Sequence, residues 1–291
     1  MKVVNILGGI GNQMFQYAFM MALRTSTGIE TRYDASVFKT YPLHNGFELD
    51  RRFCITARQA TKEEIKKLTF YTESYFLYRI IKRLPHRRTQ QFENAHCVYQ
   101  PDLLKDRRSL YYYGIWQDHR YFDAYKDVVR KEFTWREPLD ERNQQYYEKF
   151  VSRPTVSLHI RRGDYLKEWR YRNICELGYY QQAIEYVCNR FSPDLSFAIF
   201  SNDMKWSQEH IVPLLKGNDY TLVSWNQGAD SYKDMRLMSA CQYNIIANSS
   251  FSWWAAYLNI HNAPFVIAPK KWTNADVWFD RQLPEWVLIE G

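Results

Sequence analysis

The second half of the chain alternates between short apolar stretches and amphipathic segments. In Thr155–Ile160 the apolar residues Val156, Leu158 and Ile160 alternate with more polar ones, which is the pattern of a strand. Further strands are predicted at 195–200, 220–224, 243–247 and 264–268, with helical segments at 178–190, 206–216, 231–241 and 251–260. Strands that alternate with helices predict a parallel sheet in a Rossmann-like α/β domain.

The chain opens with a similar unit. A strand is predicted over Lys2–Leu7, then a glycine-rich stretch (8–13, GGIGNQ), a helix that ends at Gly28, and a second strand over Glu30–Asp34. This βαβ order resembles a dinucleotide-binding fingerprint but does not match it, because Met14 stands where the third glycine is required.

A charged, glutamine-rich helix is predicted over Glu141–Phe150, between Pro138 and Pro154. It lies between the two α/β patterns, and a length of 291 residues allows two domains of modest size. We therefore expect one domain over residues 1–150 and another over 151–291.

Composition narrows the class of protein. Hydrophobic residues make up 46% and charged residues 24%, which is ordinary for a soluble globular protein, and the net charge of +7 favours an anionic partner. The five cysteines are scattered and form no CxxC pair, so we expect reduced thiols rather than a disulfide frame or a zinc site. The absence of a signal-peptide pattern and of any long apolar run predicts a cytoplasmic protein.

Charged residues gather directly after the strand that ends at Ile160. Arg161, Arg162, Gly163 and Asp164 follow it, at the end of a strand where open α/β sheets bind ligands. Adjacent arginines can form forked hydrogen bonds to phosphate oxygens. The alternative for this segment alone is a surface ion pair between an arginine and Asp164.

A second strand end carries Asn248, Ser249 and Ser250, and a helix is predicted to begin at once with Phe251. The unpaired N–H groups of a helix start bind anions, although a serine there can equally be a helix cap without a ligand.

Two aspartates on neighbouring segments have open roles. Asp234 could accept hydrogen bonds from N1–H and N2–H of guanine, or could be a carboxylate favoured by the dipole of its helix. Asp203 could line the same pocket or cap the helix that follows it.

Several common catalytic patterns are absent. The sequence contains no DxD pair, no GxxxxGK[ST] phosphate loop, no GxSxG and no HExxH. We therefore expect arginines and a helix start, not a metal ion, to carry the charge of a phosphate.

Four segments in order resemble the motifs of glycosyltransferase family 11, the α-1,2-fucosyltransferases, in their short bacterial form. These segments are GGIGNQMFQYA (8–18), HIRRGDY (159–165), FSND (200–203) and DMRLMSACQYNIIANSSFSWW (234–254). The resemblance implies a GT-B architecture, with two Rossmann-like domains that face a cleft. It places the acceptor on residues 1–150 and GDP-fucose on residues 151–291. It also implies inverting, metal-independent transfer of L-fucose from GDP-β-L-fucose to the 2-hydroxyl of a terminal galactose, with no cofactor besides this co-substrate.

The resemblance also implies roles for individual residues. Arg161 grips the diphosphate and Arg162 orients the loop or assists. His159 and Asp234 lie near the guanine, and the phosphates meet the helix start at Ser249, Ser250 and Phe251. Gly9, Gly11 and Asn12 approach the diphosphate and the reacting sugar from the other domain. The expected catalytic residues are Asn12, Arg161 and Asp164, with Asp164, Glu168 and His44 as candidate bases and Asp164 alternatively a brace for the arginine loop.

Other interpretations remain at this stage. The enzyme could transfer another GDP-sugar or form another linkage, and the acceptor could be a galactose-terminated oligosaccharide or a lipid-linked glycan. A basic nucleic-acid-binding protein is a distant alternative, without a nucleic-acid motif to support it. The basic, aromatic segment 75–88 could rest on the inner face of the cytoplasmic membrane, or could be a solvated helix face.

Overall fold

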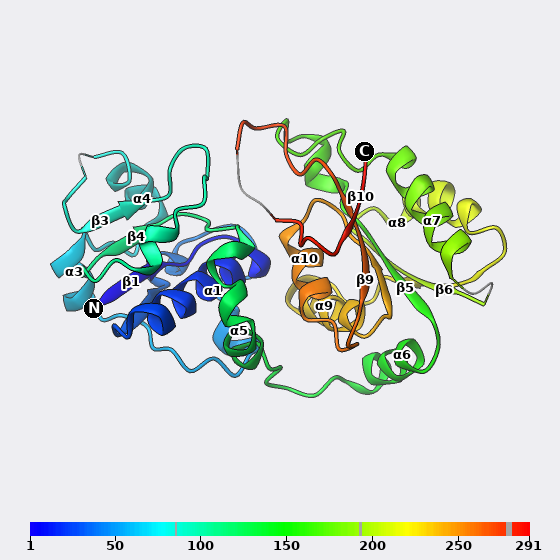
Figure 1. Cartoon of the computed structure of the whole chain (residues 1–291), viewed down its shortest axis with the longest axis horizontal. Helices are drawn as coiled ribbons and strands as arrows, with labels where there is room; N and C mark the ends of the chain where they lie inside the picture. The colour runs from blue at the N-terminus through cyan, green and yellow to red at the C-terminus, as the bar shows by residue number, and fades with distance from the viewer. Residues whose placement is uncertain (85, 192–193, 278–280) are drawn as a thin grey trace. The chain divides into compact units, whose positions relative to one another are not determined.

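The computed structural model describes residues 1–84, 86–191, 194–277 and 281–291. Internal contacts divide the chain into two compact units, shown in Figure 1. The first unit is Met1–Glu137 with Val277–Arg281, and the second is Pro138–Asp276 with Gln282–Gly291. The second unit therefore begins at Pro138, the first residue of the segment 138–154 that was expected to lie between the two α/β patterns.

The second unit contains a six-stranded parallel sheet. Its order is β10 (Val287–Ile289), β9 (Phe265–Pro269), β8 (Tyr243–Ile245), β5 (Thr155–Ile160), β6 (Ser196–Ser201) and β7 (Asp219–Val223). If these six strands are numbered 1 to 6 along the chain, starting at β5, their order from β7 to β10 is 3-2-1-4-5-6. This is the doubly wound Rossmann arrangement. The chain reverses its direction of winding between β5 and β8, and ligands bind at this point in such sheets.

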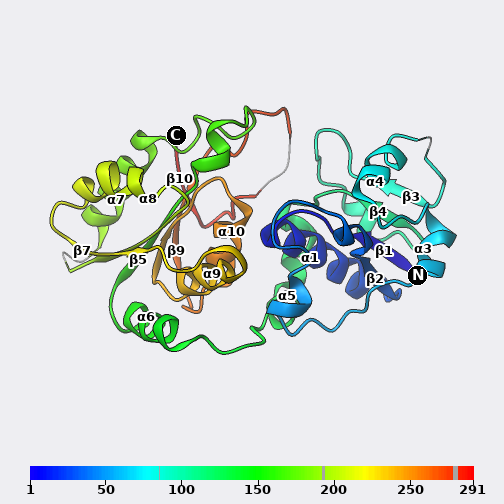
Figure 2. The ribbon, with the colours of Figure 1, turned by 180° about the vertical axis from the view of Figure 1, so that it is seen from behind.

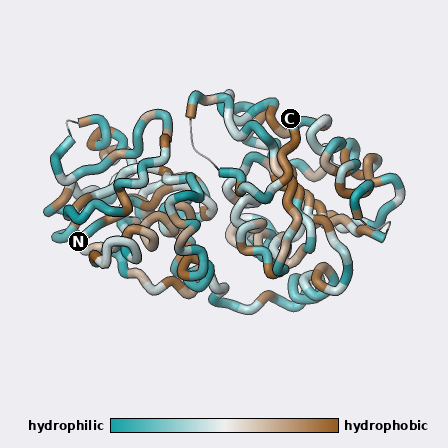
Figure 3. Tube along the Cα trace, viewed as in Figure 1, coloured by the Kyte–Doolittle hydropathy of each residue, from teal (hydrophilic) through white to brown (hydrophobic). Residues whose placement is uncertain are grey.

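Helices cover both faces of this sheet, as Figures 1 and 2 show for α7 on one side and for α9 and α10 on the other. The helices of the unit are α6 (Glu141–Ser152), α7 (Leu177–Arg190), α8 (Met204–Trp206), α9 (Tyr232–Ser239) and α10 (Ser250–Tyr257). Because both faces are covered, every residue of β5 is buried, and Figure 3 shows the central strands as a largely hydrophobic trace.

The period of two in β5 divides its side chains between the two faces. Val156, Leu158 and Ile160 belong to a core cluster with Tyr180 and other residues of α7. Ser157 instead accepts a hydrogen bond from Asn244 (Nδ2–Oγ 2.6 Å), whose amide also donates to the carbonyl at the end of α9. The odd-numbered side chains of β5 therefore face α9 and α10.

The first unit contains a four-stranded parallel sheet in the order β2 (Thr31–Asp34), β1 (Lys2–Asn5), β4 (Tyr111–Tyr113) and β3 (Gln90–Phe92). Its helices are α1 (Ile10–Thr27), α2 (Leu49–Arg52), α3 (Lys62–Leu68), α4 (Tyr75–Ile81) and α5 (Lys126–Glu132). The predicted opening βαβ unit is present. Gly28 ends α1 in the left-handed conformation (φ 67°), which favours glycine.

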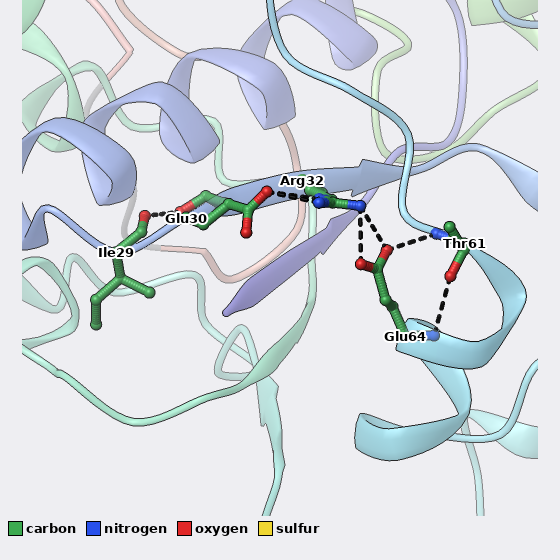
Figure 4. A network of polar contacts seen from close by, with 6 residues as sticks. Ile29, Glu30, Arg32, Thr61 and Glu64 are labelled. Carbon is green, nitrogen blue, oxygen red and sulfur yellow. Dashed lines mark hydrogen bonds and ion pairs between the residues drawn. The ribbon is translucent and has the colours of Figure 1, made fainter.

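Helix α3 begins with a capping box formed by Thr61 and Glu64. The Thr61 hydroxyl accepts from the Glu64 amide, and the Glu64 carboxylate accepts from the Thr61 amide (2.8 Å). Arg32 of β2 also binds the Glu64 carboxylate, as Figure 4 shows. The box therefore fixes both the start of α3 and its position beside the sheet.

The structure differs from the expected elements in two respects. The stretch 206–216 is not one helix, because a π-helical turn (Ser207–Ile211) and a 3-10 turn (Val212–Leu215) follow α8. The strands β3, β4 and β10 were not predicted from the sequence. No helix in the described ranges is long and apolar enough to cross a membrane.

Candidate functional site

The carboxyl ends of β5 and β8 form the candidate site of the second unit. These strands are neighbours in the sheet, and the registered pairs run to Leu158 and Ile245. The loop 161–164 follows β5, and residues 246–249 lead from β8 into α10. The two segments predicted to bind phosphate therefore meet at the point where winding reverses.

Arg161 and Arg162 point to different surroundings. Arg161 continues the odd-numbered face of β5, its guanidinium pairs with Asp164 (Nη2–Oδ1 2.9 Å), and it lies above the Tyr165 ring (5.4 Å). Its Nε is buried and has no hydrogen-bond partner among the described residues.

Arg162 lies on the α7 face of the sheet and is more deeply buried. Its guanidinium packs on the Trp206 ring at 4.0 Å and lies 3.5 Å from the Glu176 carboxylate and 3.6 Å from that of Asp203. These contacts hold Arg162 within the fold, so of the two arginines Arg161 has the geometry of a ligand-binding residue.

Asn202, at the end of β6, positions the arginine loop. Its side-chain oxygen accepts from the Arg162 amide (2.8 Å), and its amide approaches Asp164 (3.4 Å). A Cβ added at Gly163 would lie 2.5 Å from the Asn202 amide nitrogen, so any larger residue at 163 would displace the Asn202 side chain from this position. Asp203 caps α8 by accepting from the Trp206 amide (3.2 Å), which supports the capping alternative considered for it.

His159 is buried on the same face as Arg161. Its ring centroid lies 5.9 Å from that of Phe251 at the start of α10, and its Nδ1 has no hydrogen-bond partner in the described structure. Burial, together with the positive charge of Arg161, lowers the pKa of His159 to about 3. The imidazole is therefore neutral near pH 7 and offers one donor and one acceptor.

The start of α10 combines a serine cap with a buried asparagine. The Ser249 hydroxyl accepts from the Phe251 amide (3.3 Å), so the capping alternative is present in the structure. Asn248 is buried and donates to the Trp272 carbonyl (3.1 Å). Ser250 is the first residue of the helix, and the N–H groups of a first helical turn have no acceptor within the helix itself.

Asp234 lies in the first turn of α9, which begins after the loop that follows β7. It accepts a hydrogen bond from Asn226 (Nδ2–Oδ1 2.8 Å), and burial raises its pKa to about 7. Asn226 in turn exchanges hydrogen bonds with Asn143 of α6 (2.8 and 2.9 Å), and Trp225 donates to the same Asn143 oxygen (3.0 Å). The carboxylate is thus held at the carboxyl edge of the sheet, where it could accept hydrogen bonds from a base.

The glycine-rich loop of the first unit begins α1. Gly8 has φ 94°, and Gly9 precedes the helix without a side-chain cap. A Cβ at Gly9 would lie 3.2 Å from the His44 ring, and one at Gly8 would lie 2.8 Å from the Asn12 amide nitrogen. The Asn12 side chain accepts from Gln117 (2.5 Å).

The glutamines of this motif stabilise neighbouring loops. Gln13 donates to the carbonyls of Gly8 (2.8 Å) and Gly46 (2.9 Å) and accepts from the Glu48 amide (2.9 Å). Gln16 accepts from the Leu7 amide (2.8 Å) and donates to the Gly114 carbonyl (3.0 Å). Gly11 is buried in the first turn of α1.

A cavity of about 490 Å³ opens beside the segment that follows β2. The side chains of Phe38, Phe47, Tyr71 and Glu73 are among those that line this cavity. Glu73 pairs with Lys39 (2.7 Å) and accepts from the Tyr71 hydroxyl (2.5 Å). Aromatic faces with a few converging polar groups are typical of a small-ligand site.

The remaining candidate bases are placed as follows. The Glu168 carboxylate lies close to the amide of Arg170 (3.4 Å), and His44 has a left-handed backbone (φ 60°) beside Gly9 in the first unit. Within the described ranges no group of three or more His, Cys, Asp or Glu side chains is arranged to hold a metal ion.

Both units contain parallel α/β sheets, and the second brings the residues predicted to bind phosphate and a base to one edge of its sheet, which is the arrangement of the GT-B fold class. The model of glycosyl transferase family 11 matches residues 1–290, and the chain belongs to this family. The protein is therefore a glycosyltransferase, as the motifs predicted.

Named relatives span the chain. It is 33% identical to an alpha-1,2-colitosyltransferase of Escherichia coli, over 99% of this chain and 98% of that protein. It is 31% identical to the O-antigen biosynthesis glycosyltransferase WbnK of Escherichia coli, over 91% and 92%. Human galactoside alpha-(1,2)-fucosyltransferase 1 is 26% identical, over 98% of this chain and 73% of that protein.

Solved structures agree on the fold. The fucosyltransferase NodZ from Bradyrhizobium matches with a TM-score of 0.55 at 14% identity, over 87% of this chain and 92% of that chain. POFUT1 in complex with GDP matches with a TM-score of 0.51 at 12% identity, over 92% and 97%. The expected GT-B fold class is confirmed.

Proposed function

We propose that the protein transfers L-fucose from GDP-β-L-fucose to the 2-hydroxyl of a terminal galactose, with inversion and without a metal ion. The observation that carries this proposal is the meeting of Arg161, His159 and the start of α10 at the point where the parallel sheet reverses its winding. Membership of family 11 and the alpha-1,2 linkage in the names of the bacterial and human relatives support it.

In this proposal the second unit binds GDP. The Asp234 carboxylate accepts from N1–H and N2–H of guanine, His159 and Phe251 line the nucleotide, and Ser249 and Ser250 lie with the helix start beside the diphosphate. Arg161 donates to the β-phosphate, while Arg162 holds the loop from the other face of the sheet. Gly9, Gly11 and Asn12 are the proposed contacts from the first unit.

The reaction breaks the bond between C1 of fucose and the β-phosphate oxygen, and the electron pair leaves with the phosphate. Arg161 and the N–H groups of the α10 start stabilise the charge that develops there. The acceptor oxygen forms the new bond to C1 from the opposite face and passes its proton to water or to one of the two other candidate bases, Glu168 and His44. We assign Asp164 the role of a brace rather than a base, because its carboxylate is engaged by Arg161 and approached by Asn202.

The acceptor is assigned to the first unit, in the cavity lined by Phe38, Phe47, Tyr71 and Glu73. Aromatic rings can stack on the apolar face of a galactose, and a carboxylate can accept hydrogen bonds from adjacent hydroxyls. The relative named for O-antigen biosynthesis supports a surface-glycan acceptor that is assembled on the cytoplasmic side of the membrane.

Colitose is the alternative donor sugar, because a relative that spans nearly the whole chain is named as an alpha-1,2-colitosyltransferase. Colitose is L-fucose without its 3-hydroxyl. A site that pairs with this hydroxyl discriminates strongly against the deoxy sugar, whereas an apolar site discriminates weakly.

The deciding experiment offers GDP-fucose, GDP-colitose and GDP-mannose separately, and then in competition, with a panel of β-galactosides. The linkage of the product is determined by NMR. We expect an α-1,2-fucoside and a higher kcat/KM for GDP-fucose. A higher kcat/KM for GDP-colitose would replace the donor assignment, and a product linked elsewhere than at the 2-hydroxyl would overturn the acceptor assignment.

A further inference from the structure

Helix α4 and the turn after it expose a stripe of large apolar side chains. Phe76, Leu77, Ile80 and Leu84 are 70%, 48%, 44% and 41% exposed, and we call these four residues the α4 stripe. Phe76, Leu77 and Ile80 share one side of α4, and Leu84 lies in the turn that follows the helix. Tyr78, on the opposite side, is buried and belongs to the core of the first unit.

The buried side of α4 is firmly held. The Tyr78 hydroxyl donates to Asn5 of β1 (2.8 Å), and its ring lies 6.1 Å from that of Tyr113 of β4. The Ser74 hydroxyl accepts from the Leu77 amide and caps the start of the helix (3.4 Å). The exposure of the α4 stripe is thus a property of an anchored helix with a defined inner face.

Cations surround the α4 stripe. The exposed basic residues of this segment are Arg79, Lys82, Arg83, Arg87 and Arg88. No Asp or Glu occurs between Glu73 and Glu93, and Glu73 pairs with Lys39. Pro85 lies outside the described residues. The segment therefore combines an exposed apolar stripe with a locally unbalanced positive charge.

We propose that this surface docks on an anionic lipid bilayer. Large apolar side chains enter the boundary between headgroups and acyl chains, while flanking Lys and Arg bind anionic headgroups. A seven-residue helix is far too short to span a bilayer, so the contact is interfacial. The charge of the segment is complementary to the anionic lipids of a cytoplasmic leaflet, and its apolar stripe has no counterpart in a purely polyanionic ligand.

Helix α4 lies beside the cavity of the first unit, so a bilayer contact at α4 has a consequence for the acceptor. Thr40 joins the cavity to α4, because its hydroxyl donates to the Glu73 carbonyl (2.8 Å) and accepts from the Tyr75 amide (2.8 Å). Glu73 lines the cavity assigned to the acceptor, and α4 begins two residues later. A bilayer contact at α4 would hold the cavity near the membrane surface, where a lipid-linked acceptor is presented.

The test is flotation of the full chain with vesicles of phosphatidylcholine alone and with vesicles that contain equal parts of phosphatidylglycerol. We expect binding to the anionic vesicles, about fivefold less at high salt, and little binding to phosphatidylcholine alone. The variant Phe76→Ser/Ile80→Ser keeps every charge, and Lys82→Glu/Arg83→Glu keeps the α4 stripe; each should reduce binding about fivefold or more.

The matched control is Val151→Ser, which alters an apolar residue of similar exposure (41%) on α6 and should bind like the unaltered protein. Transfer to a soluble β-galactoside should be unchanged in both α4 variants, which shows that they are folded and separates this proposal from the proposed reaction. Equal flotation of the Phe76→Ser/Ile80→Ser variant and the unaltered protein would overturn the proposal, as would absence of binding to anionic vesicles.

Discussion

The guanidinium of Arg161 lies 2.9 Å from the carboxylate of Asp164, within the short loop that follows β5. The two arginines that follow β5 have different surroundings: Arg161 is the more exposed and pairs with Asp164, while Arg162 packs on Trp206. We therefore expect separable roles for the two arginines of this motif, one in transfer and one in the stability of the loop.

Replacing Arg161 should affect the reaction and not the fold. For Arg161→Ala we expect kcat/KM for GDP-fucose to fall by about 10²–10³, because a preorganised donor to the leaving phosphate is lost. The partly exposed pair with Asp164 contributes about 0–1 kcal/mol to stability, so the melting temperature should change little. Steady-state kinetics and a thermal melt of the same preparation test both points. Full activity in Arg161→Ala would contradict the assignment.

Replacing Arg162 should affect the stability of the fold more than the reaction. Arg162→Ala removes the contact with Trp206 and leaves the Glu176 and Asp203 carboxylates without their cation. We expect the free energy of unfolding to fall by about 1–3 kcal/mol, measured by urea titration. Activity well below the melting temperature should fall less than in Arg161→Ala. A larger loss of activity than in Arg161→Ala would show that Arg162 also contacts the substrate.

Asp164 can be tested as brace or base by one conservative change. Asp164→Asn keeps a hydrogen-bond acceptor for Arg161 but removes the proton acceptor. For a brace we expect kcat to fall by about tenfold or less, with the pH profile unchanged. A loss of several orders of magnitude together with disappearance of the acidic limb of the profile would identify Asp164 as the base.

Asp234 should make GDP binding depend on pH. Its carboxylate must be ionised to accept two hydrogen bonds from guanine, and its pKa in the free protein is about 7. The affinity for GDP should therefore rise about tenfold between pH 6 and pH 8. Calorimetry at both values tests this, and Asp234→Asn should bind GDP more weakly with no such rise. An equal rise in the variant would assign the pH dependence to another group.

The same pKa determines a change in stability. The folded value of about 7 lies above the ordinary value of 3.8, so folding favours the protonated carboxyl. The contribution to stability is fully present below about pH 4 and is lost as the pH rises through 7. Thermal melts should show Asp234→Asn gaining on the unaltered protein as the pH is raised.

The cavity of the first unit should govern acceptor affinity alone. In Glu73→Gln we expect KM for a β-galactoside to rise about five- to tenfold, because a charge-assisted hydrogen bond is weakened, while KM for GDP-fucose stays unchanged. Glu63→Gln, on the exposed side of α3, is the matched control. A rise in the KM of the donor would place Glu73 outside an acceptor site.

The strands and helices of the second unit could be predicted, because buried parallel strands are apolar runs and the helices that cover them are amphipathic, and these two patterns alternate along the sequence. Strands such as Tyr111–Tyr113 escaped prediction because they have only three residues and are set by pairing with distant β1. The stretch 206–216 was predicted as one helix because its apolar residues have helical spacing. That spacing does not distinguish an α-helix from the π-helical turn and the 3-10 turn, with Pro213 near its start, that the structure has here.

The candidate site was predictable as far as residues at strand ends. Arg161, His159 and Ser249 could be assigned to one edge because parallel strands end together. The contact of Arg162 with Trp206 and the role of Asn202 beside Gly163 could not be read from the motif, because both depend on residues distant in the sequence. The alternation of β5, continued past Ile160, was the available signal that Arg161 and Arg162 have different surroundings.

Asp234 belongs to a hydrogen-bond network that extends to α6, the first helix of the second unit. Asn226 connects it to Asn143 of α6, and Lys233 beside it pairs with Asp140, the cap of that same helix (2.9 Å). In the proposed donor site, guanine therefore binds a carboxylate that is hydrogen-bonded through Asn226 to the first helix of this unit.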